Sequence, residues 1–146
     1  MESINIKNES QRTLCLNNDE ARWISFDTED LNFYGRLKVL YQSLDVKQKE
    51  YEAKAKEVRG IEGNDANGVS LAALALVDIQ SEFAKYVTEG LDAIFGEGTC
   101  YRLFGNNFNP VSYSELIKGI LTRVSRDREK KLQEVLKKKP GKKVMS

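Results

Sequence analysis

The fold of this chain depends on the stretch Leu91-Asp-Ala-Ile-Phe-Gly-Glu-Gly-Thr-Cys-Tyr-Arg-Leu-Phe-Gly105, which separates two segments of helical periodicity. Its first glycine follows Phe95 directly, where a left-handed glycine commonly ends a helix. A dinucleotide-binding loop would instead follow a strand and carry a third glycine at a fixed offset. The stretch therefore predicts a structural corner, and the residues expected to form it are Phe95, Gly96, Gly98, Phe104 and Gly105.

Helices are predicted on both sides of this corner. Before it, Ser70 is a suitable N-cap, and apolar residues recur every three or four positions from Ala72 to Ile94. This apolar face is broad, which predicts a central helix that contacts both neighbours. After the corner, a second stripe begins at Tyr113, and Ser112 or Ser114 is expected to cap its helix.

A third, long helix is predicted from a cap at Asp27 or Thr28 up to the glycine-rich segment 60–68, which reads as a flexible loop. Its apolar and aromatic positions alternate at three and four residues, as in a coiled-coil seam. These positions are Tyr34, Leu37, Tyr41, Leu44, Gln48, Tyr51, Ala55 and Val58. The seam favours either one arm of an intramolecular helical hairpin or a contact with a partner, in which case Tyr34, Leu37, Tyr41, Leu44 and Tyr51 are the expected partner-binding residues.

The N-terminal segment reads as short strands. Ile4 and Ile6 alternate with polar residues, and so do Leu14 and Leu16, which predicts a hairpin that turns at residues 8–11. A third extended piece is expected at residues 22–26, with Trp23 and Phe26 as anchors on the helices. The predicted fold class is mainly α with a small N-terminal β-hairpin (α+β). It has three principal helices, one of them long and coiled-coil-like, in a single domain over residues 1–136 followed by a basic flexible tail at 137–146.

Length and composition argue against several classes of protein. The 146 residues suit one domain, and no apolar run is long enough to span a membrane. The N-terminus shows no secretory signal, which favours the cytoplasm. The chain has no histidine, the commonest general base and zinc ligand, and Cys15 and Cys100 are expected to be buried free thiols. We therefore expect no enzyme activity, no catalytic residue, no bound metal and no cofactor.

Charge is distributed unevenly along the chain. Residues 123–146 contain ten basic and three acidic side chains, a balance of +7, so residues 1–122 carry −6 within the overall +1. An acidic body with a basic end can associate with itself or with a partner of mixed charge. The chain is therefore expected to form homo-oligomers. The basic residues expected to bind a partner are Arg123, Arg126, Arg128, Lys130 and Lys131.

The motif Asp92-Ala-Ile-Phe-Gly-Glu-Gly-Thr-Cys100, followed by Leu103-Phe104-Gly105 and an aromatic-led helix, carries a resemblance to a known family. In these residues, and in its overall layout, the chain resembles small tail assembly chaperone-like proteins of long-tailed phages and prophages of Gram-positive bacteria. The resemblance implies a non-enzymatic assembly factor of the host cytoplasm. Such a factor binds the tape measure protein, keeps it soluble, and releases it as tail tube protein polymerises around it.

Two other functions remain open. The first is nucleic-acid binding, in which the basic C-terminal helix contacts phosphates through Arg123, Arg126, Arg128, Lys130 and Lys131. No helix-turn-helix spacing or aromatic platform supports it, and an acidic body would repel the phosphates. The second is a small phage inhibitor or regulator that acts through protein contact.

Overall fold

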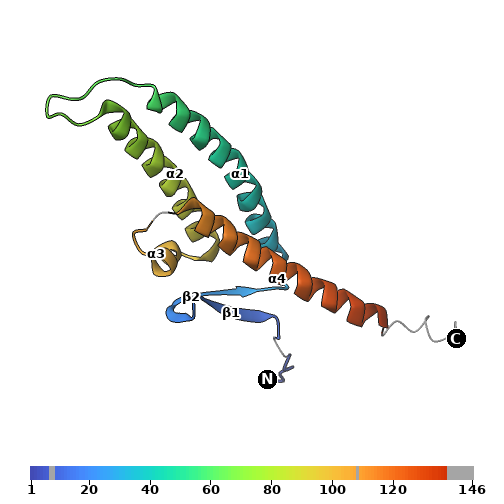
Figure 1. The fold of residues 1–146 in the computed structure, drawn as a ribbon. Coiled ribbons are helices and arrows are strands. Elements are labelled where there is room, and N and C mark those ends of the chain that lie inside the picture. The colour runs from blue at the N-terminus through green and yellow to red at the C-terminus, as the bar shows by residue number, and fades with distance from the viewer. Residues whose placement is uncertain (7–8, 108, 138–146) are drawn as a thin grey trace.

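A computed structural model of the chain describes residues 1–6, 9–107 and 109–137. The described part contains a two-stranded antiparallel sheet and four helices (Figure 1). In chain order they are β1 (Gln11–Leu16), β2 (Asp19–Asp27), α1 (Leu31–Arg59), α2 (Leu71–Phe95), α3 (Thr99–Phe104) and α4 (Pro110–Lys137). This confirms the predicted fold class, with the corner itself forming a short additional helix.

The β-hairpin is present but lies further along the chain than predicted. β1 pairs with β2 through the turn Asn17-Asn18, and both asparagines have positive φ, 53° and 60°. Asparagine tolerates this conformation, which a tight two-residue hairpin requires. Ile4 and Ile6 belong to no strand and are exposed, so the prediction of a strand there was wrong. Of the two predicted anchors, Phe26 is buried, whereas Trp23 lies on the outer face of the sheet and is 42% exposed.

Helices α1 and α2 form an antiparallel pair that projects from the rest of the molecule (Figure 1). α1 begins two or three residues later than predicted, because Asp30, rather than Thr28 or Asp27, is its N-cap and accepts a hydrogen bond from the Phe33 amide at 3.1 Å. Ser70 caps α2, as predicted, by accepting from the Ala73 amide. α1, rather than α2, is the helix that packs extensively against both of the other long helices.

The short helix α3 folds back under the C-terminal end of α2. Asp92 holds this turn with both carboxylate oxygens: Oδ1 accepts from the Cys100 amide at 2.9 Å, and Oδ2 accepts from the Gly98 amide at 3.2 Å. Gly96 and Gly98 have φ of 112° and 86°, which a residue with a side chain rarely adopts. The predicted structural corner is therefore present, and a carboxylate stabilises it.

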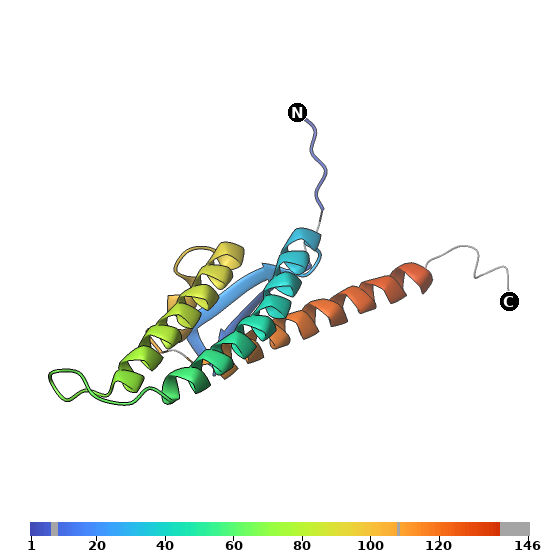
Figure 2. The same cartoon turned by 90° about the horizontal axis from the view of Figure 1, so that it is seen from above.

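α4 crosses below α1 and continues past the sheet (Figures 1 and 2). It begins at Pro110, ahead of the predicted serine caps, and Asn109 accepts a hydrogen bond from the Val111 amide through Oδ1. Its first half is buried through Tyr113, Ile117 and Val124. Lys137, placed by the prediction in the tail, is still helical, and the rest of the predicted tail lies outside the described residues.

One hydrophobic core holds these elements together. Its members come from the sheet, the first half of α1, the second half of α2, α3 and the first half of α4. The largest fully buried side chains include Ile24, Leu37, Leu91, Leu103 and Ile117. The core therefore lies where the helical pair meets the sheet, and the far part of that pair extends beyond it.

Candidate functional site

A shallow groove with an almost wholly apolar lining lies between the start of α1 and the end of α2, and it encloses about 590 Å³. Leu31 and Val39 stand at its α1 side, and Val39 is 64% exposed. Small residues, Gly90 and Ala93, form the α2 side. We call this surface the α1–α2 groove; it is lined by Leu31, Asn32, Gly35, Arg36, Val39, Leu40, Ser43, Gly90, Ala93 and Ile94.

The groove exists because α1 and α2 approach each other closely at Gly90. A Cβ atom at this position would lie 2.6 Å from Cδ1 of Leu40, so any larger residue would displace that buried leucine. The missing side chain on α2 leaves a depression beside the contact. The depression is thus a consequence of helix packing and does not depend on a mobile loop.

Gly35 lies in the same groove but has no packing reason to be glycine. A Cβ atom added there would meet nothing within 4 Å, and its φ is not in the left-handed region. Glycine inside a helix is destabilising by about 0.5 to 1 kcal/mol relative to alanine. Since no described residue from another part of the chain approaches this position, its small size suits the close approach of another molecule.

Polar side chains close the two ends of the groove and hold its walls in place. At one end, the Arg36 guanidinium donates to the Ala93 carbonyl at 2.5 Å, in the last turn of α2. A cation there also interacts favourably with the negative end of the helix dipole. At the other end, the Tyr86 hydroxyl donates to the Ser43 hydroxyl at 2.8 Å. The part of the groove with exposed apolar residues on α1, from Leu31 to Val39, is about 12 Å or two helical turns long.

The predicted seam of α1 is used inside the molecule. Leu37 and Leu44 are buried, and the three tyrosines are half-buried. The Tyr51 ring stacks on Phe83 of α2 at 5.3 Å between centroids, and the Tyr34 hydroxyl lies 3.5 Å from the Ser125 hydroxyl of α4. The described structure therefore corresponds to the intramolecular alternative, and Leu37 and Leu44 have no free surface to offer a partner.

The predicted basic residues of α4 divide into two groups. Arg123, Arg126 and Lys130 are exposed, and their spacing of three and four residues places them along one face of the helix. Arg128 is half-buried, with its guanidinium 5.9 Å from the Tyr34 ring centroid, and Lys131 pairs with Glu29 at 3.4 Å. The five residues thus lie on one helix segment without forming a single surface.

The corner residues anchor the turn to its neighbours. Phe95 packs edge-on against Phe33 at 5.5 Å, and Phe104 packs edge-on against Tyr113 at 4.5 Å. Burial raises the pKa of Tyr113 to about 12, with the nearby Cys100 adding to the effect, and burial likewise raises the pKa of Cys100. These shifts are those of groups kept neutral in a core.

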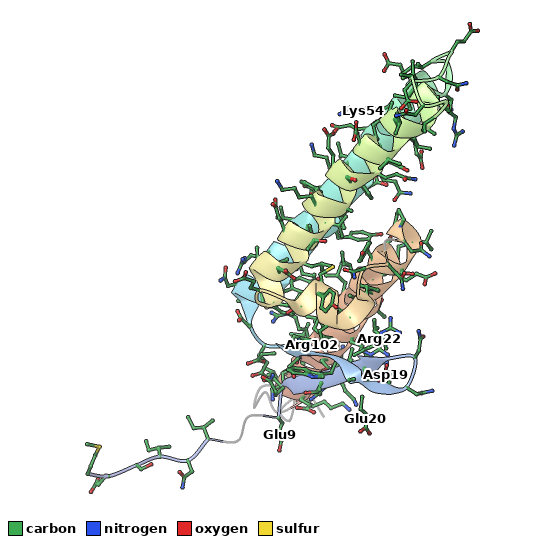
Figure 3. All side chains as sticks on the ribbon, turned by 90° about the vertical axis from the view of Figure 1, so that its left-hand side faces the viewer. Glu9, Asp19, Glu20, Arg22, Lys54 and Arg102 are labelled. Carbon is green, nitrogen blue, oxygen red and sulfur yellow. The ribbon has the colours of Figure 1, made fainter. Side chains whose placement is uncertain are left out.

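Two arginines connect the sheet to α3, and Figure 3 shows both beside the sheet, at the opposite end of the molecule from Lys54. Arg22 donates through Nε to the Leu103 carbonyl at 2.5 Å. Arg102 donates through Nε to the Trp23 carbonyl at 3.0 Å, and its guanidinium lies 3.9 Å from the centre of the indole ring. Arg102 therefore stacks on Trp23 and ties α3 to the outer face of the sheet.

The described residues contain no group of three or more side chains suited to holding a metal ion. No helix in the described ranges is both long and apolar enough to cross a bilayer. Cys100 is buried as predicted, whereas Cys15 is exposed on β1, because strand alternation places it on the outer face. Asp27 has a lowered pKa because the Ser10 side chain and the Glu29 amide donate to its carboxylate, which makes it a turn-stabilising group.

Comparison with known families identifies a relationship for most of the chain. Residues 17–143 match the model of a family described as a family of unknown function, DUF6673. The chain belongs to this family. No curated protein and no solved structure matches it. The matched range includes every described helix of this DUF6673 protein, and with them the whole α1–α2 groove.

Sequence reasoning missed the groove and found the corner. Asp92, which holds the corner, lies within the quoted motif but was not singled out. Gly35 carried a usable signal, because a glycine inside an otherwise helical segment is unfavourable unless something requires it. Gly90 and Ala93 carried no such signal, because the groove forms only where α1 packs against α2, and the sequence does not show which helices pack together.

Proposed function

We propose that this DUF6673 protein is a non-enzymatic assembly chaperone of a phage tail, which binds an amphipathic helix of the tape measure protein in the α1–α2 groove. The observation that carries the proposal is the groove itself, an exposed apolar surface with Gly35 among its lining residues. A helix can approach closely where the facing residues are small, and an apolar groove buries the apolar face of such a helix. The resemblance of the corner motif to tail assembly chaperone-like proteins supplies the identity of the client.

The size of the groove suits a reversible contact. At about two turns, it can accept the apolar side chains that a client helix presents at positions i, i+3 or i+4, and i+7. So small a surface binds weakly by itself, and many weak sites along a long client allow release when tube subunits replace the chaperone. The proposed place of action is the cytoplasm of the host cell.

The experiment is co-expression with helical fragments of the tape measure protein encoded beside the gene, measured by fragment solubility and co-purification. In the first variant, Gly35→Glu places a charge in the groove, while the helix gains a better helix former. Val39→Glu is the second variant, at an exposed position. The matched control is Ala53→Glu, which makes the same type of change at an exposed site on α1, about 27 Å further along the helix.

We expect the fragment to be soluble with the unmodified chain and with Ala53→Glu, and insoluble or unbound with Gly35→Glu and Val39→Glu. Circular dichroism must show that all variants are folded. If Gly35→Glu and Val39→Glu still hold the fragment in solution, the groove is not the binding surface. If the unmodified chain binds no fragment, the proposed function itself is wrong.

Nucleic-acid binding is the second candidate, and one observation favours it. Arg123, Arg126 and Lys130 are exposed along one face of α4, as expected for a helix that follows a phosphate backbone. A gel shift with nonspecific DNA at low salt tests it, with Arg126→Glu as the variant and Lys118→Glu as the matched control. Absence of retardation by the unmodified chain would remove this candidate.

A further inference from the structure

Two surfaces at opposite ends of the molecule carry apolar side chains that the described part of the chain leaves uncovered. The first, the acidic tip, lies at the far end of the α1–α2 pair, and the second, the basic overhang, lies on α4 beyond the sheet (Figure 1). The acidic tip comprises Ile61, Glu62, Val69, Leu71, Leu74, Val77 and Asp78. The basic overhang comprises Arg128, Lys130, Lys131, Leu132 and Val135.

The acidic tip is unusual in both its exposed apolar residues and its charge. Leu74 is 43% and Val77 is 56% exposed, on the side of α2 that faces away from α1. Asp78 lies one turn after Leu74 and is exposed. Residues 60–84 contain four acidic side chains and no lysine or arginine. The adjoining end of α1 adds Lys54, Lys56 and Arg59, and residues 52–84 together, with six acidic and three basic side chains, keep a net charge of −3.

The basic overhang continues the core-facing stripe of α4 past the point where the core ends. Leu132 is 51% and Val135 is 59% exposed, although their helical positions continue the buried series of Ile117 and Val124. A groove of about 460 Å³ separates this part of α4 from the start of the hairpin, and four basic and four acidic side chains line it, Lys130 and Lys131 among them. Residues 126–137 contain five basic and three acidic side chains, so the overhang presents an apolar strip with a net positive charge.

These two surfaces complement each other in charge and in apolar character, but one molecule cannot join them. α1 has 29 residues and is about 43 Å long, and the two surfaces lie at opposite ends of the fold (Figures 1 and 2). Burial of apolar side chains provides the favourable free energy of such a contact, and opposite charges orient it. A second copy of the chain supplies the missing partner for each surface.

We propose that copies of this chain associate head to tail, with the acidic tip of one copy bound to the basic overhang of the next. Such a contact uses two different surfaces, so in an open assembly only the two terminal copies each keep one unused surface. The assembly either closes into a ring or grows as an open filament. The proposal does not rest on the tape measure protein as client, because neither surface includes the α1–α2 groove.

Sedimentation velocity of the full chain over a range of concentrations tests the proposal. The tip variant is Glu62→Lys with Asp78→Lys, and the overhang variant is Lys130→Glu with Lys131→Glu. Lys131→Gln is the control for loss of the Lys131–Glu29 ion pair without charge reversal. Glu115→Lys is the matched control for a charge reversal at an exposed site outside both surfaces.

We expect the unmodified chain to form species larger than a dimer, and this association to weaken as salt rises from about 50 to about 500 mM. Each double variant should weaken association about tenfold or more. An equal mixture of the two variants should restore association. In an assembly in which the two variants alternate, every contact pairs opposite charges. The two controls should associate like the unmodified chain.

Three results would overturn the proposal. The first is an unmodified chain that is a monomer at every concentration. The second is a dimer that neither double variant weakens, since this indicates a symmetric contact elsewhere. The third is a mixture of the two double variants that associates no more strongly than either variant alone. This last result would show that the two surfaces do not meet, whatever the outcome of the co-expression with tape measure fragments.

Discussion

The base of this molecule and its projecting arm have similar helical periodicity but very different packing. In the base, α3, the sheet and parts of the three long helices bury the largest side chains, among them Leu37, Leu103 and Ile117. In the arm, formed by residues 45–82, Ala55 is the one buried apolar side chain among the described residues. The arm nevertheless exposes Val46, Leu74 and Val77.

The comparison shows that apolar residues have different roles in the two regions. Those of the base stabilise the fold, whereas the exposed ones of the arm add little to the stability of the isolated chain. The Tyr51 ring of the arm stacks on Phe83 at the edge of the core. The arm also contains exposed ion pairs, such as Lys47–Glu50, and such pairs contribute little to stability. An arm with weak internal packing and exposed apolar residues is suited to contact with another molecule.

The largest expected effect comes from shortening a side chain in the base. Leu103→Ala removes a fully buried leucine and should lower the free energy of unfolding by about 2 to 5 kcal/mol. The matched change in the arm is Leu74→Ala, which should cost less than about 1 kcal/mol because Leu74 is half-exposed. Urea unfolding followed by circular dichroism measures both, and equal losses would contradict the comparison.

The next effect concerns the corner that joins the two regions. Asp92→Ala leaves the Gly98 and Cys100 amides without their acceptor and should lower the free energy of unfolding by about 1 to 2 kcal/mol. Amide exchange should increase first in α3. Asp78→Ala is the control, at an exposed aspartate of the same helix. Unchanged exchange in α3 would show that the glycines suffice to hold the turn.

A smaller effect is expected at alkaline pH, and only in the base. The pKa of Tyr113 is about 12 in the folded chain, above its ordinary value of 10.0. A raised pKa means that the folded state holds the proton more tightly, so this stabilisation is complete below pH 10 and is lost as pH rises towards 12. Tyr113→Phe should flatten this pH dependence, although it also removes the hydrogen bond to the Asn107 carbonyl. Thermal unfolding across this pH range measures the change, and an equally steep loss in the variant would exclude Tyr113 as its source.

The smallest effects distinguish two glycines of the α1–α2 groove. Gly35→Ala should raise the free energy of unfolding by about 0.5 to 1 kcal/mol, because the added methyl group meets no neighbour. Gly90→Ala should show no such gain, because its methyl group would displace Leu40. Chemical denaturation compares the two directly. A loss of stability in Gly35→Ala would show that this position is constrained inside the chain after all.

Prediction from sequence succeeded where a signal is local and strong. The Ser70 cap, the glycine corner and the seam positions from Leu37 to Ala55 are all in place, since each depends on residues close in the chain. It failed on the hairpin register, where the alternation of Ile4 and Ile6 outweighed the Asn17-Asn18 turn.

By itself, the sequence determined which segments are helical, where the chain turns at Gly96-Glu97-Gly98, and that basic charge gathers at the C-terminal end, because these properties arise from neighbouring residues. Only the tertiary structure decided that the seam of α1 is covered by α2 and α4, and that apolar residues remain exposed in the groove, at the tip and on the overhang. The physical reason is that the exposure of a helix face depends on what packs against it. An apolar stripe looks the same in sequence whether its partner is part of the same chain or another molecule.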